Sequence, residues 1–373
     1  MSKKHVVIPV FVPHRGCPND CIFCNQKKIS GQMEDMTPGK IHETVDMHLG
    51  TIREDAFVEI AFYGGSFTAI EKEQQEEFLR HAYGYVRAGK VSEIRVSTRP
   101  DRIDRGILEL LKRYGVRTIE LGVQSLDDDV LRTSLRGHDS AVVFRSAKLV
   151  KDMGFSLGIQ IMTGLPGDTR EKCLETARKV ISMGPDLVRI YPVLVIKGTG
   201  LEKMMERGEY RPQDLEEAVD LCAELLRLFE DNGINVIRVG LQPTENIRTG
   251  TGSDVVAGPV HPAFRQLAQA RVSLKRIEEM IESQRLSDAR EIIIRTGPSR
   301  VSDVVGQKRT NIEYLKKKYG FARVRVIPDP ALSGEIIYHA VSSVSTDTVS
   351  TTSALSNSAT TSIAPGENTI SGM

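Results

Sequence analysis

The chain has 373 residues, with 50 Lys and Arg, 49 Asp and Glu, and a formal net charge of +1. No window approaches the about 18 uninterrupted apolar residues of a membrane span. Of the five cysteines, Cys173 and Cys222 lie far from the other three and from each other, so the five form no even disulfide framework. We therefore expect a soluble cytoplasmic protein, without a membrane partner, that is long enough for one large core and one smaller core.

Short β-branched runs alternate with amphipathic helical periods through the first half of the chain. The pattern predicts strands at 5–12, 57–64, 92–99, 117–125, 156–163 and 187–195. Six strand-helix units in series predict an α/β fold with a parallel sheet, and right-handed crossovers curl such a sheet into a partial, TIM-like barrel. We expect ligands at the carboxyl ends of its strands.

The rhythm changes after about residue 197, where a helix over 214–233 precedes a strand over 234–240. A second module then reads as a helix, a strand (EIIIRTG), a helix (QKRTNIEYLKKKYG) and two further strands (ARVRVIP and GEIIYHA). The last stretch is rich in Ser and Thr and poor in large apolar residues, which predicts disorder. The predicted domains are a barrel with its extension at 1–260, a small α/β module at 261–341 and a tail at 342–373.

The second module is strongly basic. Residues 261–328 hold 15 Lys and Arg against 7 Asp and Glu. This imbalance suggests a polyanionic partner such as tRNA or another RNA, although basic helix faces are also common on solvated surfaces. The candidate contact residues are Lys308, Arg309, Lys316, Lys317 and Lys318.

Three cysteines directly follow the first predicted strand, in the stretch PHRGCPNDCIFCNQ. Cys17, Cys21 and Cys24 offer three thiolates on one short loop. An iron–sulfur cube held by three cysteines leaves one iron open, so a substrate or cofactor is the expected fourth ligand. The alternative is a structural zinc site completed by His14 or His5.

Polar residues follow or interrupt the carboxyl ends of the other predicted strands. Gly64, Gly65 and Ser66 end the second strand, and Ser97, Gln124 and Gln160 lie near the ends of the next three. A diglycine is often only a turn, and a single glutamine is often a satisfied structural group. Several such residues facing a three-thiolate loop favour a bound polar cofactor.

With these motifs in place, the chain resembles radical S-adenosylmethionine (SAM) enzymes and, among them, the catalytic subunit of Elongator. The resemblance covers residues 5–265. It rests on the cysteine loop, the diglycine turn and, in order along the chain, STRPD, IELGVQSLDDDVL, RGH, GLPGDT and IYPVLVIKGTGLEKMMERGEY.

The resemblance implies a 4Fe-4S cluster held by Cys17, Cys21 and Cys24, with Phe23 at the aromatic position before the last cysteine. It also implies SAM as cofactor, reductive SAM cleavage to a 5′-deoxyadenosyl radical, and an external flavodoxin- or ferredoxin-like electron donor. The implied SAM contacts are Gly64, Gly65, Ser66, Ser97, Gln124, Arg136 and Gln160. Arg136 suits a carboxylate because its guanidinium forms bidentate ion pairs, although a surface salt bridge is the alternative.

Two departures from the Elongator pattern limit the resemblance. The first two cysteines lie closer together here, and only residues 266–373 follow the matching region, so we expect no acetyltransferase domain.

Three functions compete. They are a radical SAM enzyme acting on RNA, the same chemistry on a small molecule such as a tetrapyrrole, and a non-catalytic, metal-stabilised RNA-binding protein. His261 lies in a loop that can reach the barrel mouth, but a lone loop histidine is more often structural.

Overall fold

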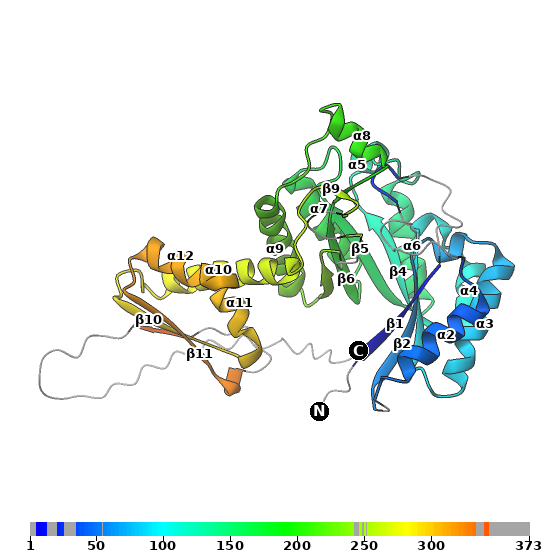
Figure 1. Cartoon of the computed structure of the whole chain (residues 1–373), viewed down its shortest axis with the longest axis horizontal. Coiled ribbons are helices and arrows are strands. Elements are labelled where there is room, and N and C mark those ends of the chain that lie inside the picture. The colour runs from blue at the N-terminus through cyan, green and yellow to red at the C-terminus, as the bar shows by residue number, and fades with distance from the viewer. Residues whose placement is uncertain are drawn as a thin grey trace, which may run out of the picture.

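The computed structural model of this chain describes residues 5–12, 21–25, 35–53, 55–241, 246–247, 250, 252–332 and 339–342. Its main feature is a seven-stranded parallel sheet that curls into a half-barrel (Figure 1). This confirms the predicted partial α/β barrel. In spatial order the strands are β1 (His5–Phe11), β2 (Phe57–Tyr63), β3 (Glu93–Thr98), β4 (Val116–Gln124), β5 (Ser156–Thr163), β6 (Leu187–Pro192) and β8 (Asn235–Val239).

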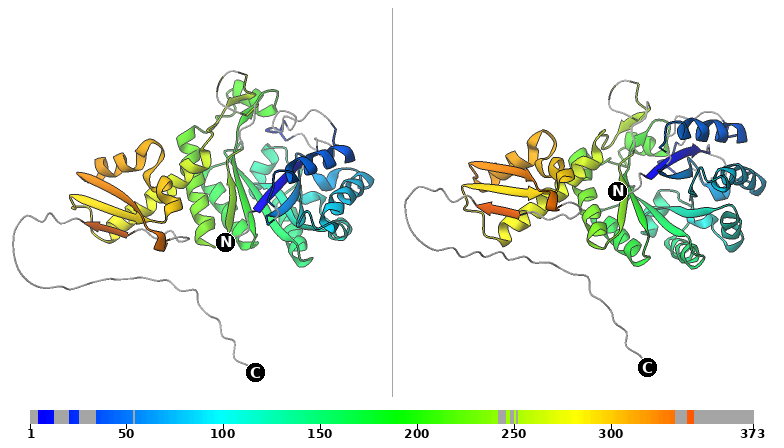
Figure 2. Two further views of the ribbon diagram at one scale, coloured as in Figure 1. Left: turned by 60° about the horizontal axis from the view of Figure 1, so that its bottom comes forward. Right: turned by 90° about the horizontal axis from the view of Figure 1, so that it is seen from below.

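Helices cover the outer side of the curled sheet (Figure 2). None of those described is long and apolar enough to cross a membrane. The principal helices of this layer are α2 (Pro38–Leu49), α3 (Lys72–Arg87), α4 (Arg105–Arg113), α6 (Ser140–Asp152), α7 (Arg170–Ser182) and α9 (Leu215–Asp231), with the short α5 (Asp128–Thr133) and α8 (Gly200–Glu206) above the strand ends.

The sheet separates an apolar layer from a polar interior. Alternate strand residues such as Ile94, Val96 and Ile119 are fully buried and belong to one large apolar cluster with the helices. Because successive side chains of a strand point to opposite faces, the intervening residues line the inside of the half-barrel. There the sequence carries charged and amide side chains, so the polar site lies on the concave face.

Polar caps start many of the helices and fix where each strand-to-helix loop ends. The side chains of Asp104, Asp139 and Thr169 each accept the backbone N–H three residues further on. Such caps contribute about 1 kcal/mol each. They hold the loops at the carboxyl ends of the strands, where the candidate site residues lie.

Two details of the barrel differ from the sequence prediction. The strand predicted over 187–195 ends at Pro192, and Val195–Ile196 form a separate short strand, β7, which pairs antiparallel with β9 (Val255–Ala257). The strand predicted after the change of rhythm, β8, joins the main sheet as its seventh strand beside β6. The sequence pattern missed this pairing because the tertiary fold, and not local periodicity, determines which strands are neighbours.

The C-terminal region has its own small sheet and apolar cluster. Its three strands lie in the order β11-β10-β12, with β11 parallel and β12 antiparallel to β10. The domain boundaries 260/261 and 341/342 remain predictions, and residues 343–373 of the predicted tail lie outside the described residues. The elements are α10 (Phe264–Ser283), β10 (Glu291–Thr296), α11 (Val301–Val305), α12 (Thr310–Tyr319), β11 (Arg323–Pro328) and β12 (His339–Ser342).

Helix α10 joins the two regions by packing against α9 (Figure 1). Ion pairs line the contact between the two helices. Arg271 pairs with Glu216 and Asp220, while Lys275 meets Glu224 at 3.1 Å. Several basic side chains of residues 261–328 are therefore already paired with acidic side chains of α9.

The basic helix of this region starts later than predicted. Lys308 and Arg309 have φ angles of 52° and 65°, which lie outside the helical range, so α12 begins at Thr310 and not at Gln307. The two cations therefore lie on a turn before the helix.

Candidate functional site

The cysteine loop is fixed at the top of the half-barrel by backbone contacts. Ile22 donates its N–H to the carbonyl of Ser134 at 3.3 Å and accepts from the N–H of Leu201 at 2.7 Å. The N–H of Cys24 donates to the carbonyl of Cys21 at 2.9 Å, which closes a turn. Cys21 is buried and Cys24 is half-buried, while Cys17 lies outside the described residues.

The aromatic side chain of Phe23 is half-buried and packs against a small apolar cluster. This cluster includes Ile22, Val130 and Leu201, so residues from α5 and α8 pack against the loop. The loop that carries two of the three candidate ligands is therefore anchored by packing as well as by hydrogen bonds.

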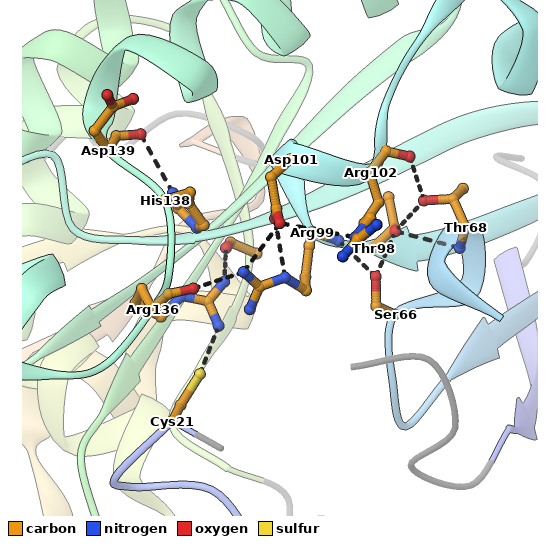
Figure 3. A network of polar contacts seen from close by, with 11 residues as sticks. Cys21, Ser66, Thr68, Thr98, Arg99, Asp101, Arg102, Arg136, His138 and Asp139 are labelled. Atoms are coloured by element: carbon orange, nitrogen blue, oxygen red, sulfur yellow. Dashed lines mark hydrogen bonds and ion pairs between the residues drawn. The ribbon is translucent and has the colours of Figure 1, made fainter. Parts of the chain in front are cut away.

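Arg136 connects the cysteine loop to the sheet. Its Nη1 donates to the Sγ of Cys21 at 3.2 Å, and its Nη2 donates to the carbonyl of Gly122 on β4 at 2.6 Å (Figure 3). The side chain is almost fully buried. Arg136 does not lie on the surface, and the contacts described for its guanidinium are to a sulfur and a carbonyl inside the protein.

Arg99 supports Arg136 from the end of β3. Its guanidinium donates to the carbonyl of Arg136 at 2.6 Å and forms an ion pair with Asp101, with an Nε to Oδ1 distance of 2.9 Å (Figure 3). Arg99 is buried. Sequence reasoning quoted STRPD as a motif but gave this arginine no role; its position after an apolar strand was the available signal.

A chain of hydroxyl groups orders the turn after β2. The Oγ1 of Thr98 lies 2.9 Å from the Oγ of Ser66 and 2.5 Å from the Oγ1 of Thr68, and the N–H of Arg99 donates to Ser66 Oγ at 3.1 Å (Figure 3). Ser66, Thr68 and Thr98 are all buried. Sequence reasoning selected the neighbouring Ser97, which is half-buried, and missed the linking role of Thr98.

The diglycine turn leaves no room for a side chain at its first position. Gly64 has a φ of 99°, and a Cβ placed on it would come within 2.9 Å of the carbonyl oxygen of Val12. Only glycine tolerates both conditions. Gly64 and Gly65 are half-buried, so the backbone between β2 and Ser66 is open to a ligand.

The two candidate glutamines contact each other. Gln160 Nε2 donates to Gln124 Oε1 at 3.1 Å. Gln124 has a φ of 69°, and the pairing of β4 with β5 shifts register between Gly122 and Gln124, which re-aims this side chain. A Cβ on Gly122 would lie 3.0 Å from the amide nitrogen of Gln124.

His138 completes the region around Arg136. Burial and the neighbouring Arg136 lower the pKa of His138 to about 4, so the imidazole is neutral at physiological pH. Its Nδ1 faces the carbonyl of Asp139 at 3.3 Å (Figure 3).

Inside the half-barrel lies a charged network that sequence reasoning missed. Arg95 donates to Glu59 at 2.7 Å and to Glu120 at 2.7 Å, and Arg189 Nη2 donates to Glu120 at 3.0 Å and to the hydroxyl of Tyr63 at 2.7 Å. Each of these charged residues is flanked by apolar neighbours within its strand, on β2, β3, β4 and β6. That recurring mid-strand charge was the signal available from sequence.

Burial and the interactions between neighbouring carboxyl groups shift the pKa values of Glu93 and Glu59. Glu93 lies beside Glu59; burial, a hydrogen bond from Glu93 to Glu59 and their repulsion raise the pKa of Glu93 to about 7. Burial opposes ionisation of Glu59, yet the contacts with Glu93 and Arg95 lower its pKa overall. One shared proton and two arginines thus balance the three carboxylates in the lumen.

The described residues do not support the alternative of a structural zinc site. His5 lies at the amino end of β1 with its Nε2 2.6 Å from Glu59, whereas the cysteines follow the other end of that strand. His5 therefore does not complete a site with them, and His14 lies outside the described residues. Within the described part of the chain, no group of three His, Cys, Asp or Glu is arranged to hold a metal.

The donor set at the strand ends nevertheless suits an iron–sulfur cluster. Thiolates are the usual ligands of such clusters, and the guanidinium of Arg136 donates a hydrogen bond to the sulfur of Cys21. The other thiols, Cys173 and Cys222, are buried in α7 and α9, and burial raises the pKa of each. The half-buried backbone at Gly64 and Gly65 is accessible to a polar ligand.

Two of the predicted RNA-contacting lysines already have partners. Lys316 Nζ lies 3.3 Å from Glu313, and Lys318 Nζ lies 2.6 Å from Glu278 and close to the ring of Tyr319. Lys317 is exposed. His261 accepts the N–H of Ala263 at 3.1 Å and so shapes the start of α10, as expected for a structural histidine.

A curled parallel sheet with polar residues and a cysteine loop at its carboxyl ends defines an α/β barrel enzyme whose chemistry occurs at that edge. The sequence matches the Radical SAM superfamily over residues 11–180 and the Radical_SAM C-terminal domain over residues 185–276. The chain belongs to the radical SAM superfamily, as predicted, and is a radical SAM enzyme. The family implies a 4Fe-4S cluster and SAM as cofactors, and its enzymes need a reductant.

Individual relatives match part of the chain. It is 31% identical over 186 residues to a tRNA uridine(34) acetyltransferase of Methanocaldococcus infernus, covering 44% of this chain and 35% of that protein. It is 32% identical over 191 residues to Elongator complex protein 3 of Homo sapiens, covering 46% and 35%. The chain thus spans about a third of the length of these curated relatives.

A solved structure shares the fold. The archaeal Methanocaldococcus infernus Elp3, with an N-terminal deletion, superposes with a TM-score of 0.55 at 21% sequence identity, covering 77% of this chain and 64% of that one. At that identity the likeness shows the fold alone.

Proposed function

We infer that Cys17, Cys21 and Cys24 hold the 4Fe-4S cluster and that SAM binds between this loop and the strand ends, where the enzyme uses it to abstract hydrogen from an RNA substrate. The observation that carries the inference is the contact from Arg136 to both Cys21 and Gly122, because it joins the cysteine loop to the polar end of β4. The proposed SAM contacts are Phe23, Gly64, Gly65, Ser66, Ser97, Gln124, Arg136 and Gln160.

The chain's own residues bind and orient the cofactors. The guanidinium of Arg136 donates to the sulfur of Cys21 and presents a cation to the carboxylate of the methionine moiety. Gly64 and Gly65 open their backbone to the methionine amino group, and Thr98 fixes the hydroxyl of Ser66 beside it. When bound, the reduced cluster and SAM supply one-electron cleavage to methionine and a 5′-deoxyadenosyl radical that takes a hydrogen atom from the substrate.

The amides of Gln124 and Gln160 and the hydroxyl of Ser97 are suited to the polar atoms of the adenosine half. Ser97 and Gln160 belong to the concave, polar face of the sheet by strand alternation, and Gln124 joins them through its hydrogen bond with Gln160. The apolar packing of Phe23 and the buried turn at Ser66 exclude water from the same region.

RNA as the substrate is supported by two observations. A relative matched over 44% of this chain carries the name tRNA uridine(34) acetyltransferase, and residues 261–328 have an excess of basic residues. We therefore propose tRNA or another RNA as the molecule modified, with a flavodoxin- or ferredoxin-like donor and a cytoplasmic location.

The test is an anaerobic assay of the reconstituted protein. Iron and sulfide per chain and 5′-deoxyadenosine formed from SAM and dithionite are measured with and without total tRNA. We expect a cluster-dependent product that tRNA stimulates. Cys24→Ala should lose iron and product while keeping the fold, whereas Cys222→Ala, a buried thiol of α9, should keep both.

Two outcomes contradict the proposal at different levels. A protein that binds zinc without iron and forms no 5′-deoxyadenosine rejects the cofactor assignment. The second outcome is SAM cleavage that does not respond to total tRNA but is stimulated by a small-molecule extract. It would reject the RNA substrate and leave the cofactor assignment intact.

A further inference from the structure

Three side chains form a bridge across the concave face of the half-barrel. Arg189 of β6 donates from Nη2 to the hydroxyl of Tyr63 on β2 at 2.7 Å and from Nη1 to the hydroxyl of Tyr191 at 3.2 Å. Strands β3, β4 and β5 separate β2 from β6 (Figure 1), and in a flat sheet four strand spacings would place the two roughly 19 Å apart. One side-chain contact joins them because the sheet is curled, and we call Tyr63, Arg189 and Tyr191 the tyrosine bridge.

The tyrosine bridge lies beside the proposed cofactor contacts. Tyr63 is the last residue of β2 and directly precedes Gly64, and Arg189 pairs in register with Gln160. Both tyrosines are half-buried, so part of each side chain remains accessible. A substrate that loses a hydrogen atom at these strand ends therefore lies within reach of the two hydroxyls.

The guanidinium of Arg189 is fixed and its charge is balanced. Its Nε lies 2.7 Å from Glu120 Oε2, its Nη2 donates to Glu120 Oε1 at 3.0 Å, and its central carbon lies 5.2 Å from the ring centroid of Tyr63. Because the carboxylate of Glu120 neutralises this arginine, the bridge presents no free cation. A phosphate or carboxylate group is therefore not the ligand that the bridge favours.

What the bridge does offer is a pair of hydrogen-bond donors. Each hydroxyl oxygen accepts from Arg189, which leaves the hydrogen of each O–H to donate elsewhere. Within the described part of the chain, neither hydrogen has an acceptor. Burial and the nearby Glu120 raise the pKa of Tyr63 to about 12, so its hydroxyl keeps its proton at physiological pH. Two O–H donors on one guanidinium suit a neutral acceptor such as a carbonyl oxygen, which has two lone pairs.

We propose that Tyr63 and Tyr191, held by Arg189, donate hydrogen bonds to a carbonyl oxygen of the target base in the RNA substrate and so determine which of its hydrogen atoms faces the cofactor. The proposal rests on the RNA substrate inferred above and names the part of the RNA that the site recognises. Uracil, cytosine and guanine carry a carbonyl oxygen and adenine does not, so the target base is one of the first three.

The test follows hydrogen transfer from RNA in the reconstituted full-length enzyme. Total tRNA from cells grown in heavy water carries deuterium on carbon, so abstraction from RNA gives deuterated 5′-deoxyadenosine, which mass spectrometry detects. The variant Tyr63→Phe/Tyr191→Phe should lower the deuterated fraction about tenfold, since each lost hydrogen bond costs roughly threefold or more. Iron content and the 5′-deoxyadenosine formed without RNA should stay within about twofold of the wild type.

A matched control and two single variants guard against a fold defect. Tyr114→Phe removes a hydroxyl that donates to Glu76 at 2.7 Å between the outer helices α3 and α4, and it should leave the deuterated fraction unchanged. Tyr63→Phe and Tyr191→Phe alone should each lower the fraction roughly threefold, and they decide the question if the double variant loses iron. Circular dichroism and urea unfolding check each protein.

Three results would overturn the proposal. A deuterated fraction that is the same in the wild type and in the tyrosine variants would reject the tyrosine bridge and leave the RNA function standing. Cleavage of SAM without RNA that falls as far as the deuterated fraction would assign the tyrosines to the cofactor and not to the substrate. If the wild type cleaves SAM but forms no deuterated 5′-deoxyadenosine with tRNA, the RNA substrate and the tyrosine bridge both fall.

Discussion

The guanidinium of Arg136 donates a hydrogen bond to the sulfur of Cys21 at 3.2 Å, across 115 positions of sequence. The same group donates to the carbonyl of Gly122 at 2.6 Å, and Arg99 holds the backbone of Arg136 at 2.6 Å. The cysteine loop, the end of β4 and the end of β3 are thus tied together by two buried arginines.

Replacing Arg136 by Gln should weaken the cofactor site. Hydrogen bonds to charged groups contribute about 1.5–3 kcal/mol, so the KM for SAM should rise roughly tenfold or more and cluster retention should fall. Iron content after gel filtration and 5′-deoxyadenosine kinetics measure these effects. Arg132→Gln, an exposed arginine paired with Asp129, is the control; equal effects in both variants would assign Arg136 no special role.

Thr98→Val should disturb the turn that carries Ser66. The substitution keeps the shape but leaves the hydroxyls of Ser66 and Thr68 without their shared partner, which costs about 1–3 kcal/mol. Urea unfolding measures the loss, and an increased KM for SAM should accompany it. Thr133→Val removes an exposed helix hydroxyl and should be nearly neutral. If Thr98→Val left both the free energy of unfolding and the KM for SAM unchanged, the hydroxyl chain would contribute neither to stability nor to SAM binding.

Glu120→Gln should destabilise the barrel interior. Glu120 bonds to both Arg95 and Arg189, so its neutralisation leaves two buried cations without their common carboxylate. Breaking buried pairs in this way costs about 3 kcal/mol. The free energy of unfolding, compared with that of the exposed α4 variant Glu109→Gln, tests this. A loss no greater than in the control would mean that water or a rearrangement satisfies the arginines.

Stability should depend on the protonation of Glu93. Burial and the neighbouring Glu59 raise the pKa of Glu93 to about 7 from the ordinary glutamate value of 4.5. The folded state therefore holds a proton between pH 4.5 and 7 that the unfolded state releases, so this group reduces the free energy of unfolding as pH rises through that window.

Glu93→Gln should accordingly be more stable than the wild type at pH 8 and about equally stable at pH 4. Because Glu93 is half-exposed, solvent screening limits the expected difference to about 1 kcal/mol. Urea unfolding at both pH values measures it, with the exposed Glu43→Gln as a control for removing one negative charge. A difference that is the same at both pH values contradicts the assignment.

The sequence predicted the order of strands and helices well because apolar periodicity is a local property. Motif spacing also selected the cysteine loop and the diglycine turn as candidate sites, and the family resemblance added Arg136. It misplaced the start of α12, where Lys308 and Arg309 adopt left-handed conformations, and selected Ser97 while missing Thr98. Which of two adjacent hydroxyls meets Ser66 depends on the side of the strand that faces the turn, and spacing does not encode that.

By itself, the sequence determined the class of this protein: a repeated strand-helix pattern builds the half-barrel, and three thiols on one loop offer an incomplete ligand set. Only the tertiary structure decided which polar residues meet. It added β8 to the sheet, placed Arg136 against Cys21, balanced four mid-strand charges inside the lumen and joined Tyr63 to Tyr191 through Arg189. These arrangements join residues far apart in sequence, and long-range packing and electrostatic pairing, not local periodicity, select them.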